Sequence, residues 1–322
     1  METQVYRPPF LLRGSHLSTI VPALLRKPAF AEPAYERLPT PDDDFLELDW
    51  YRQGKRLLAI ISHGLEGDSR RPYVVGMARA FYRQGYDILA WNYRGCGLTL
   101  NRQPRLYHSG ATDDLHTVVQ HAIRQGYQRI LLIGFSLGGN ITLKYVGEQQ
   151  ADLPAAVAAA IAWSVPLDLA AGSQEISKPH NFIYEKRFLN RLRKKIMLKH
   201  RQFPDIFDTR HLKEIKTLYQ FDDRYTGPIH GFTGADDYYA RCSSVHFLPG
   251  IRIPTLIVNA LNDPFLPEAC YPLEAAATNP LITFETPAHG GHVGFATLNN
   301  QGIYWSEQRS LAFAAQVLAD EA

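Results

Sequence analysis

The sequence predicts an α/β fold: a mostly parallel central sheet, helices on both faces of that sheet, and a helical cap insertion. Short apolar segments typical of buried strands alternate with segments typical of helices, and this alternation is characteristic of a parallel sheet covered on both faces. The alternation stops between residues 168 and 250, an interval far longer than a usual connection. We therefore expect this interval to form the cap.

In chain order, short apolar runs predict the strands and the segments between them predict the helices. The predicted strands span residues 45–51, 57–62, 87–93, 129–135, 157–165, 255–260 and 282–286. The predicted helices span residues 72–84, 112–124, 137–148, 267–277 and 305–319. This order divides the chain into an N-terminal segment with the first part of the core (1–167), the helical cap insertion (168–250) and the second part of the core (251–322).

The composition is that of an ordinary globular protein and excludes several classes. With 322 residues, of which 45% are hydrophobic and 20% charged, the chain can bury a large core. A formal charge of +2 provides no global electrostatic footprint for nucleic acid. The three scattered cysteines, Cys96, Cys242 and Cys270, argue against a disulfide framework and favour a reducing compartment. Because no apolar run reaches the length of a membrane span or signal-peptide core, we expect a cytoplasmic protein without an integral membrane segment.

The most informative motif is Gly134-Phe135-Ser136-Leu137-Gly138, which ends one predicted strand and begins a predicted helix. In a nucleophile elbow the serine occupies such a turn with a strained backbone, and the glycines two residues before and after it leave room for the neighbouring strand and helix. The pattern alone is weak, but its strand and helix context is the one the motif requires. We therefore predict that Ser136 is a nucleophile.

A serine hydroxyl needs an adjacent base, and histidine is the expected one. The predicted strand 282–286 runs into a glycine-rich loop that contains two histidines. We favour His292, because Gly291 and Gly294 let the loop wrap closely around its imidazole, whereas His289 lies nearer the strand end. His289 stays the alternative, and a histidine in such a loop is often only a hydrogen-bonded structural residue.

The histidine in turn needs a carboxylate that fixes its tautomer and stabilises the imidazolium. Asp263 follows the predicted strand 255–260, and ligands meet open α/β sheets at the carboxyl ends of such strands. An aspartate before a proline is also common as a turn or helix cap, which is the alternative role. Five other aspartates compete less well because they fall inside the predicted cap: Asp168, Asp222, Asp223, Asp236 and Asp237.

Attack by serine builds negative charge on a carbonyl oxygen, which requires preorganised hydrogen-bond donors. We predict two backbone N–H donors, one from Leu137, which follows the nucleophile, and one from Leu65, in the loop after the predicted strand 57–62. A simple tight turn is the alternative for that loop. The loop around His289 and His292 lacks the spacing of a metal site, so we predict neither a metal nor a cofactor.

Together these motifs resemble the α/β-hydrolase superfamily and, within it, the YheT-like esterases. The similarity covers nearly the whole chain and is carried by residues 13–20, 63–67, 92–97, 107–110, the turn at Ser136, 262–264 and 291–295. The chain order Ser136, Asp263, His292 is also that of the superfamily. The resemblance implies that these three residues form the charge relay and that carboxylic esters are hydrolysed, with the physiological substrate left open. Similar eukaryotic proteins carry membrane anchors and act on lipids, and this sequence shows no such anchor.

Two groups of residues within the predicted cap have open interpretations. Residues 187–201 are basic and amphipathic; such a run could attract anionic lipid or acidic substrates, but more often it is the solvated outer face of a helix. Five aromatic residues either line an acyl pocket or form a small core of the cap itself: Tyr225, Phe232, Tyr238, Tyr239 and Phe247.

The predicted function is hydrolysis of a small-molecule ester by two-step acyl transfer. In this scheme His292 accepts the Ser136 proton, protonates the leaving alcohol and then activates water. Two alternatives are a lipase or phospholipase acting at a membrane surface through weak peripheral contact, and a non-catalytic binding protein on a hydrolase scaffold. Thioesters, lactones and amides share the same chemistry and stay open, as does the oligomeric state. A serine in the turn disfavours dehalogenation by a carboxylate nucleophile.

Overall fold

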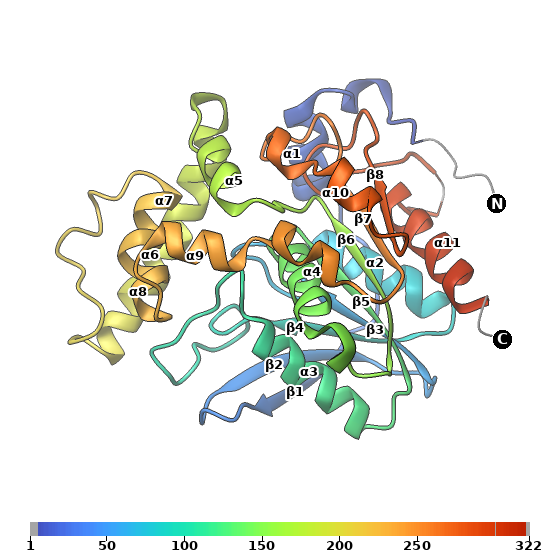
Figure 1. The fold of residues 1–322 in the computed structure, drawn as a ribbon, viewed down its shortest axis with the longest axis horizontal. Coiled ribbons are helices and arrows are strands. Elements are labelled where there is room, and N and C mark those ends of the chain that lie inside the picture. Colours follow the sequence, from blue (N-terminus) through green and yellow to red (C-terminus); the bar gives the residue numbers. More distant parts are fainter. Residues whose placement is uncertain (1–5, 300, 320–322) are drawn as a thin grey trace.

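The computed structural model describes residues 6–299 and 301–319, which form a single eight-stranded sheet with helices around it (Figure 1). The strand order is β1-β2-β4-β3-β5-β6-β7-β8; β1 and β2 pair antiparallel to their neighbours, and β4 to β8 form a parallel block with β3. The strands are β1 Ala34–Pro39, β2 Phe45–Tyr51, β3 Leu57–Ser62, β4 Asp87–Asn92, β5 Arg129–Phe135, β6 Val157–Trp163, β7 Thr255–Val258 and β8 Ile282–Glu285. The predicted mostly parallel α/β fold is confirmed.

Helices occupy most connections between the strands. The longer ones are α1 Ser15–Leu25, α2 Pro72–Arg83, α3 Thr112–Arg124, α4 Leu137–Gln149, α5 Leu169–Ile176, α6 Phe182–Gln202, α9 Ala235–Cys242 and α11 Trp305–Ala319. The short ones are α7 Leu218–Phe221, α8 Gly227–Ile229 and α10 Leu273–Ala277, with 3-10 turns η1 Phe10–Leu12, η2 Gln150–Asp152, η3 Pro179–Asn181, η5 Ser244–Gly250 and η6 Glu268–Cys270 and a π-helical turn η4 Asp222–Thr226.

The helices cover both faces of the sheet. Leu115 of α3 and Ile141 of α4 belong to the apolar core on one face, and Met77 of α2 and Phe313 of α11 belong to the core on the other. Strands β3 to β7 are therefore buried on both sides, which explains why they are nearly continuous apolar runs in the sequence. In Figure 1 the helices α2 and α11 lie to the right of the sheet, and α3 and α4 lie in front of it.

Between β6 and β7 the chain leaves the sheet and forms α5 to α9, η4 and η5; we call residues 164–254 the β6–β7 segment. Its helices α5 to α9 gather at the left of Figure 1, coloured from yellow-green to orange. Leu189 and Ile196 of α6 form an apolar cluster with Phe207 inside this segment. Phe265 and Leu266, which follow β7, belong to the same cluster and join the segment to the core.

Two regions differ from the elements that the sequence predicts. No element is predicted before residue 45, yet α1 and β1 precede it; β1 is an edge strand with mostly exposed side chains, and α1 contains Pro22, so both lack a clear apolar pattern. The helix predicted at 267–277 is wrong, because the chain forms η6 and then α10. Pro272 separates these two turns, since a proline lacks an N–H and disfavours a helical residue before it. The other predicted ends shift by at most two residues.

Arg94, in the turn after β4, forms a buried ion-pair network that the sequence does not reveal. Its guanidinium lies 3.0 Å from Asp44 Oδ2 and 2.7 Å from Asp114 Oδ1, and these three side chains are at most 2% exposed. A third carboxylate, Asp42, lies 2.7 Å from the same guanidinium. The network joins the turn between β1 and β2, the turn after β4 and the first turn of α3.

We expect Arg94→Met to lower the free energy of unfolding by about 3–5 kcal/mol, because it leaves the carboxylates of Asp44 and Asp114 buried without a cation. Urea denaturation measures the change. The control is Arg102→Met, which removes an exposed arginine 3.3 Å from Asp43 and should cost at most about 1 kcal/mol. Equal losses in the two variants would contradict a special role for the buried network.

Candidate active site

Ser136 lies in a strained turn between β5 and α4. Its backbone angles are φ 54° and ψ −120°, a conformation that non-glycine residues rarely adopt. The neighbouring glycines allow close packing there: a Cβ on Gly134 would lie 2.3 Å from the carbonyl oxygen of Gly138, and a Cβ on Gly138 would lie 2.4 Å from that of Ser62. The turn therefore has the geometry that a nucleophile elbow requires.

The structure brings Ser136, His292 and Asp263 together. The distance from Ser136 Oγ to His292 Nε2 is 2.9 Å, and the distance from His292 Nδ1 to Asp263 Oδ2 is also 2.9 Å. The side chain of Asp263 is 0% exposed and that of His292 is 12% exposed. This arrangement fits a neutral imidazole whose Nδ1–H donates to Asp263 and whose Nε2 accepts the hydroxyl proton of Ser136.

The competing residues lie elsewhere. His289 Nδ1 is 3.0 Å from the carbonyl oxygen of Arg13. Asp168 caps α5 by accepting the N–H of Ala171 at 2.9 Å. Asp263 is the only carboxylate within residues 6–299 and 301–319 that pairs with His292. Among the other aspartates, Asp222 lines a cavity shared with Ser136 but forms no hydrogen bond to His292.

The loop that carries His292 is held by α1, which explains the role of the motif at residues 13–20. The backbone N–H of His292 donates to Thr19 Oγ1 at 2.9 Å. A Cβ on Gly294 would lie 2.0 Å from the carbonyl oxygen of Ser18, so this glycine lets the loop approach α1. The expectation that Gly294 makes room for the imidazole is therefore wrong, because the close contact is with α1.

The loop after β3 leaves the Leu65 N–H available beside Ser136. The N–H groups on either side of it are occupied: that of Gly64 donates to Tyr73 Oη and that of Glu66 donates to Tyr107 Oη, both at 2.9 Å. Neither the Leu65 nor the Leu137 N–H has an acceptor in the part of the chain that the structure describes. Both leucines line a cavity with Ser136. Their two N–H groups could therefore donate hydrogen bonds to a negatively charged oxygen that forms beside Ser136.

Side chains of α6 hold the loop that follows β3. Lys195 Nζ lies 2.5 Å from Glu66 Oε1, and both side chains are buried. Arg191 Nη1 donates to the carbonyl oxygen of Glu66 at 2.7 Å, and Tyr107 Oη donates to the carboxylate oxygen Oε1 of Glu66 at 2.7 Å. Burial alone would lower the pKa of Lys195, but Cys96 and Glu66 outweigh burial and raise it, so the ammonium stays charged.

The basic stretch of α6 is therefore not simply a solvated outer face, as its sequence suggests. Lys199, one turn after Lys195, is fully buried and donates to the carbonyl oxygens of Asn101 and Gln103. Periodicity could not reveal this, because a lysine reads as a surface residue until the loop carbonyls that surround it are known. The next helix face still carries exposed cations such as Lys194.

His63, beside the same loop, is excluded as a base. It is fully buried, and burial lowers its pKa to about 3. Its Nδ1–H donates to the carbonyl oxygen of Gly64 at 2.8 Å, and its Nε2 accepts the N–H of Tyr93 at 3.4 Å. The imidazole is therefore neutral and braces the loop.

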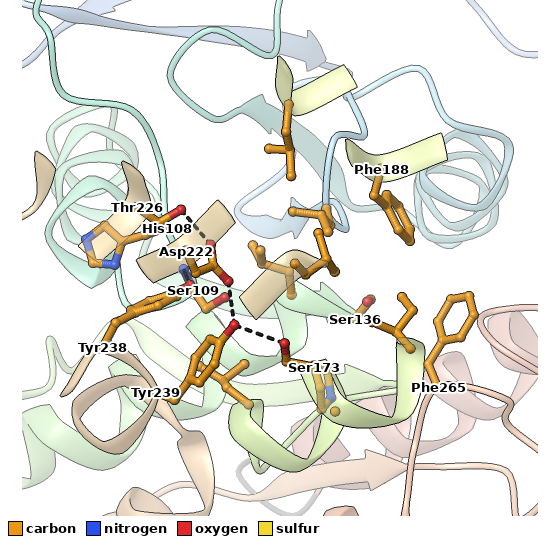
Figure 2. A pocket seen from close by; sticks show the side chains of 18 of the residues that line it. His108, Ser109, Ser136, Ser173, Phe188, Asp222, Thr226, Tyr238, Tyr239 and Phe265 are labelled. Carbon is orange, nitrogen blue, oxygen red and sulfur yellow. Dashed lines mark hydrogen bonds between the residues drawn. The ribbon is translucent and has the colours of Figure 1, made fainter. Parts of the chain in front are cut away.

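Two cavities meet at Ser136 and His292. The first has a volume of about 130 Å³ and extends into the β6–β7 segment (Figure 2). The second has a volume of about 270 Å³ and lies between α1, the loop after β3 and α6. Leu65, Phe188 and Phe265 border both. A ligand bound at Ser136 would thus have one cavity on each side of it.

No helix in the described ranges has the length and apolar character needed to cross a bilayer. Likewise, no three His, Cys, Asp or Glu side chains within residues 6–299 and 301–319 are grouped closely enough to hold a metal ion.

Comparisons with known proteins show the family of the chain. The family model described as alpha/beta hydrolase fold matches residues 60–297. The chain is 35% identical over 288 residues to "Putative esterase YheT" of Escherichia coli (strain K12), covering 87% of this chain and 84% of that protein. It is 28% identical over 305 residues to "Phospholipase ABHD3" of Bos taurus, covering 91% and 74%. Among solved structures, the esterase Pf2001 of Pyrococcus furiosus matches with a TM-score of 0.58 at 15% identity, covering 88% and 90%, which supports the fold alone.

We expect Lys195→Met to lower the free energy of unfolding by about 3–5 kcal/mol, because it leaves Glu66 buried without its cation. Lys194→Met is the matched control: the neighbouring lysine is exposed, and its loss should change the stability by no more than about 0.5 kcal/mol. Chemical denaturation of both variants measures the difference. An unchanged free energy of unfolding in Lys195→Met would show that the ion pair does not hold the loop.

Proposed function

The chain belongs to the α/β-hydrolase fold family, and we propose that this hydrolase is a serine esterase that cleaves carboxylic esters through an acyl-enzyme. The observation that carries the proposal is the continuous hydrogen-bond path from Ser136 through His292 to Asp263, with 2.9 Å at each link. The similarity to a protein named as an esterase supports the same reaction. An intact path of this kind counts against a non-catalytic binding protein.

In the acylation step Ser136 Oγ attacks the carbonyl carbon of the ester while its proton passes to His292 Nε2. Asp263 stabilises the imidazolium that forms, and the N–H groups of Leu65 and Leu137 donate to the negatively charged oxygen. When the tetrahedral intermediate collapses, the C–O bond to the alcohol breaks and His292 returns the proton to the leaving oxygen. The acyl group then remains on Ser136.

In the deacylation step a water molecule replaces the alcohol. His292 accepts a proton from the water as its oxygen attacks the acyl carbon, and the same two N–H donors stabilise the second oxyanion. Collapse breaks the bond to Ser136 Oγ, which takes the proton back from His292. The product is a carboxylic acid, and the enzyme returns to its starting state.

We further propose that residues 168–250 of the β6–β7 segment act as a cap, with core parts at residues 1–167 and 251–322. The first cavity supports this division, because it is bordered by core residues such as Ser136 and by Ser173 and Tyr239 of the segment. A cytoplasmic location is also part of the proposal, since the three cysteines Cys96, Cys242 and Cys270 are free thiols.

The second candidate function is hydrolysis of lipids at a membrane surface. The second cavity favours it: Arg71, Arg187 and Arg191 border this cavity and could attract anionic headgroups. At the same cavity, Leu24 is 59% exposed and Ile183 is 70% exposed, so apolar side chains face solvent beside the cations. The phospholipase among the relatives supports the same reading.

We expect His292→Ala to reduce kcat for p-nitrophenyl esters by roughly 10⁴-fold or more, because it removes the base that activates Ser136. The matched control is His289→Ala, which should retain activity because its imidazole hydrogen-bonds to the carbonyl oxygen of Arg13, whereas His292 pairs with Ser136 and Asp263. Steady-state kinetics on both variants checks this. Loss of activity in His289→Ala alone would reverse the assignment.

A fluorophosphonate should form one covalent adduct on the wild-type protein, at Ser136, because only this hydroxyl is activated by the histidine. Peptide mapping by mass spectrometry locates the adduct. A Ser136→Ala variant should lose it, whereas Ser177→Ala, which changes a serine that borders neither cavity, keeps the predicted nucleophile and serves as the control. A stoichiometric adduct on another residue would refute Ser136 as the nucleophile.

The lipid alternative predicts co-sedimentation with vesicles that contain anionic lipid, reduced by Ile183→Ser and by Arg187→Gln, because these side chains combine apolar contact with charge. Met197→Ser is the control, since Met197 is 43% exposed on the same helix but does not border the second cavity. Absence of vesicle binding, together with a preference for short acyl chains, would exclude this alternative in favour of a soluble esterase.

A further inference from the structure

The first cavity contains a polar cluster that the proposed reaction does not use. Figure 2 shows Ser173, Asp222, Thr226 and Tyr239 joined by hydrogen bonds on one side of the cavity, with Ser136 on the other side. Most of the remaining wall is apolar and includes Leu65, Leu169, Ile176, Leu192, Leu218 and Leu266. A substrate arm that enters from Ser136 therefore passes apolar side chains and meets this cluster.

The hydrogen bonds within the cluster leave acceptor sites unused. Thr226 Oγ1 donates to Asp222 Oδ1 at 2.5 Å, and Tyr239 Oη donates to Asp222 Oδ2 at 2.7 Å. The Tyr239 hydroxyl has one proton, so the 3.0 Å contact to Ser173 Oγ places Ser173 as the donor to Tyr239. A carboxylate can accept about four hydrogen bonds, and side chains provide two of them here. Asp222 thus keeps the capacity to accept a hydrogen bond from a ligand.

No cation compensates the charge of Asp222. Its partners are hydroxyl groups, and no lysine, arginine or histidine in the described ranges forms an ion pair with it. Burial raises its pKa to about 6, although the hydrogen bonds from Thr226 and Tyr239 act in the opposite direction. A carboxyl group held in an apolar cavity without a counter-charge is costly unless a further donor reaches it.

We propose that Asp222, together with Tyr239 and Ser173, forms a specificity subsite that binds a hydroxyl group at the end of the substrate arm filling the first cavity. This inference rests on the proposed esterase function and names its substrate class: aliphatic esters with a terminal hydroxyl on one arm. A hydroxyl can donate to the free lone pairs of Asp222 and accept from Ser173 after a small rotation of that side chain.

The chemistry of the cluster also disfavours anionic and apolar ends. A carboxylate or phosphate would be repelled by Asp222. A methyl end cannot donate a hydrogen bond to the Asp222 carboxyl group. It would also exclude water from that group and so leave a buried acceptor unsatisfied. Discrimination between hydroxyl and methyl ends is therefore expected to be large, as it is wherever a site is built to hydrogen-bond a substrate hydroxyl.

The competing explanation is that the cluster only holds α5, η4 and α9 together. Ser173 lies on α5, Asp222 and Thr226 on η4, and Tyr239 on α9, so the hydrogen bonds do join three elements. A structural role would lower the stability of variants and the activity toward every substrate alike. A specificity role changes the ratio between two substrates of one variant, and the stability of the fold cannot move that ratio.

The experiment uses two ester series measured by titration of the released acid. In the first series the acyl chain ends in a hydroxyl, as in methyl ω-hydroxyalkanoates; in the second the alcohol chain does, as in ω-hydroxyalkyl butyrates. Each ester is paired with a methyl-ended ester of the same length, and each rate is normalised to the amount of Ser136 that reacts with a fluorophosphonate. We expect kcat/KM to favour the hydroxyl-ended ester in one series at a defined chain length. Preference for methyl ends at every length in both series would overturn the proposal.

The variants assign that preference to the cluster. Asp222→Leu should lower the hydroxyl-to-methyl ratio of kcat/KM by roughly tenfold to a hundredfold, because the hydrogen bond to a charged acceptor is lost. Tyr239→Phe should lower it less, and it decides the question if Asp222→Leu does not fold. The matched control is Asp236→Asn, which removes a carboxylate from an exposed site on α9 and should leave the ratio unchanged. An unchanged ratio in Asp222→Leu and Tyr239→Phe would overturn the subsite.

The same measurements separate failure of the subsite from failure of the esterase proposal. If the wild-type protein hydrolyses p-nitrophenyl acetate and is labelled at Ser136 but shows no hydroxyl preference, only the subsite is wrong. If it neither hydrolyses any ester nor reacts with the fluorophosphonate, the proposed function itself is wrong.

Discussion

The strained backbone at Ser136 is the constraint on which the arrangement of the site depends. A serine at φ 54° persists only where its surroundings fix it, and here β5 and α4 pack closely while the start of α4 contacts the end of β3. The same contact places the first N–H of α4 beside the loop that follows β3. The predicted nucleophile and both predicted oxyanion donors therefore arise from one close approach between a helix and two parallel strands.

The strain is shared by the other loops at this edge of the sheet. Glu66, Ser164 and Val293 also have positive φ, at 51°, 52° and 61°, and each lies in a loop near Ser136. Such a residue costs on the order of 1–3 kcal/mol and persists only where its surroundings fix it. Here the fixing contacts are specific: Lys195 holds the Glu66 carboxylate, and Ser164 Oγ accepts the N–H of Val293 at 2.9 Å. The β6–β7 segment is therefore part of what holds the site in shape, since Lys195 belongs to it.

The sequence predicts most of the core because the parallel strands β3 to β7 are buried apolar runs, and it predicts Ser136, Asp263 and His292 because each follows a predicted strand. What it cannot predict are contacts between distant segments. Thr19 Oγ1 accepts the N–H of His292, and Thr19 lies on α1, a helix whose apolar pattern is interrupted by Pro22. Lys195 resembles a surface residue in any helical projection, and only the folded chain brings Glu66 to it. Asp222 is likewise one acidic residue among several until the cavity is known.

The two cavities at Ser136 differ in charge, and this difference gives the site a direction. Asp222 places an uncompensated acid in the first cavity, whereas Arg71, Arg187 and Arg191 border the second. Because Ser136 and His292 lie where the cavities meet, an ester whose arms differ in polarity has one favourable orientation. In the reversed orientation, an anionic group would lie near Asp222, or a hydrogen-bond donor of the ester would lie beside the guanidinium groups. Either mismatch is unfavourable in a partly buried site. Under the proposed esterase function, the charge pattern would thus select between the two arms of an ester before any contact is made with the bond to be cleaved.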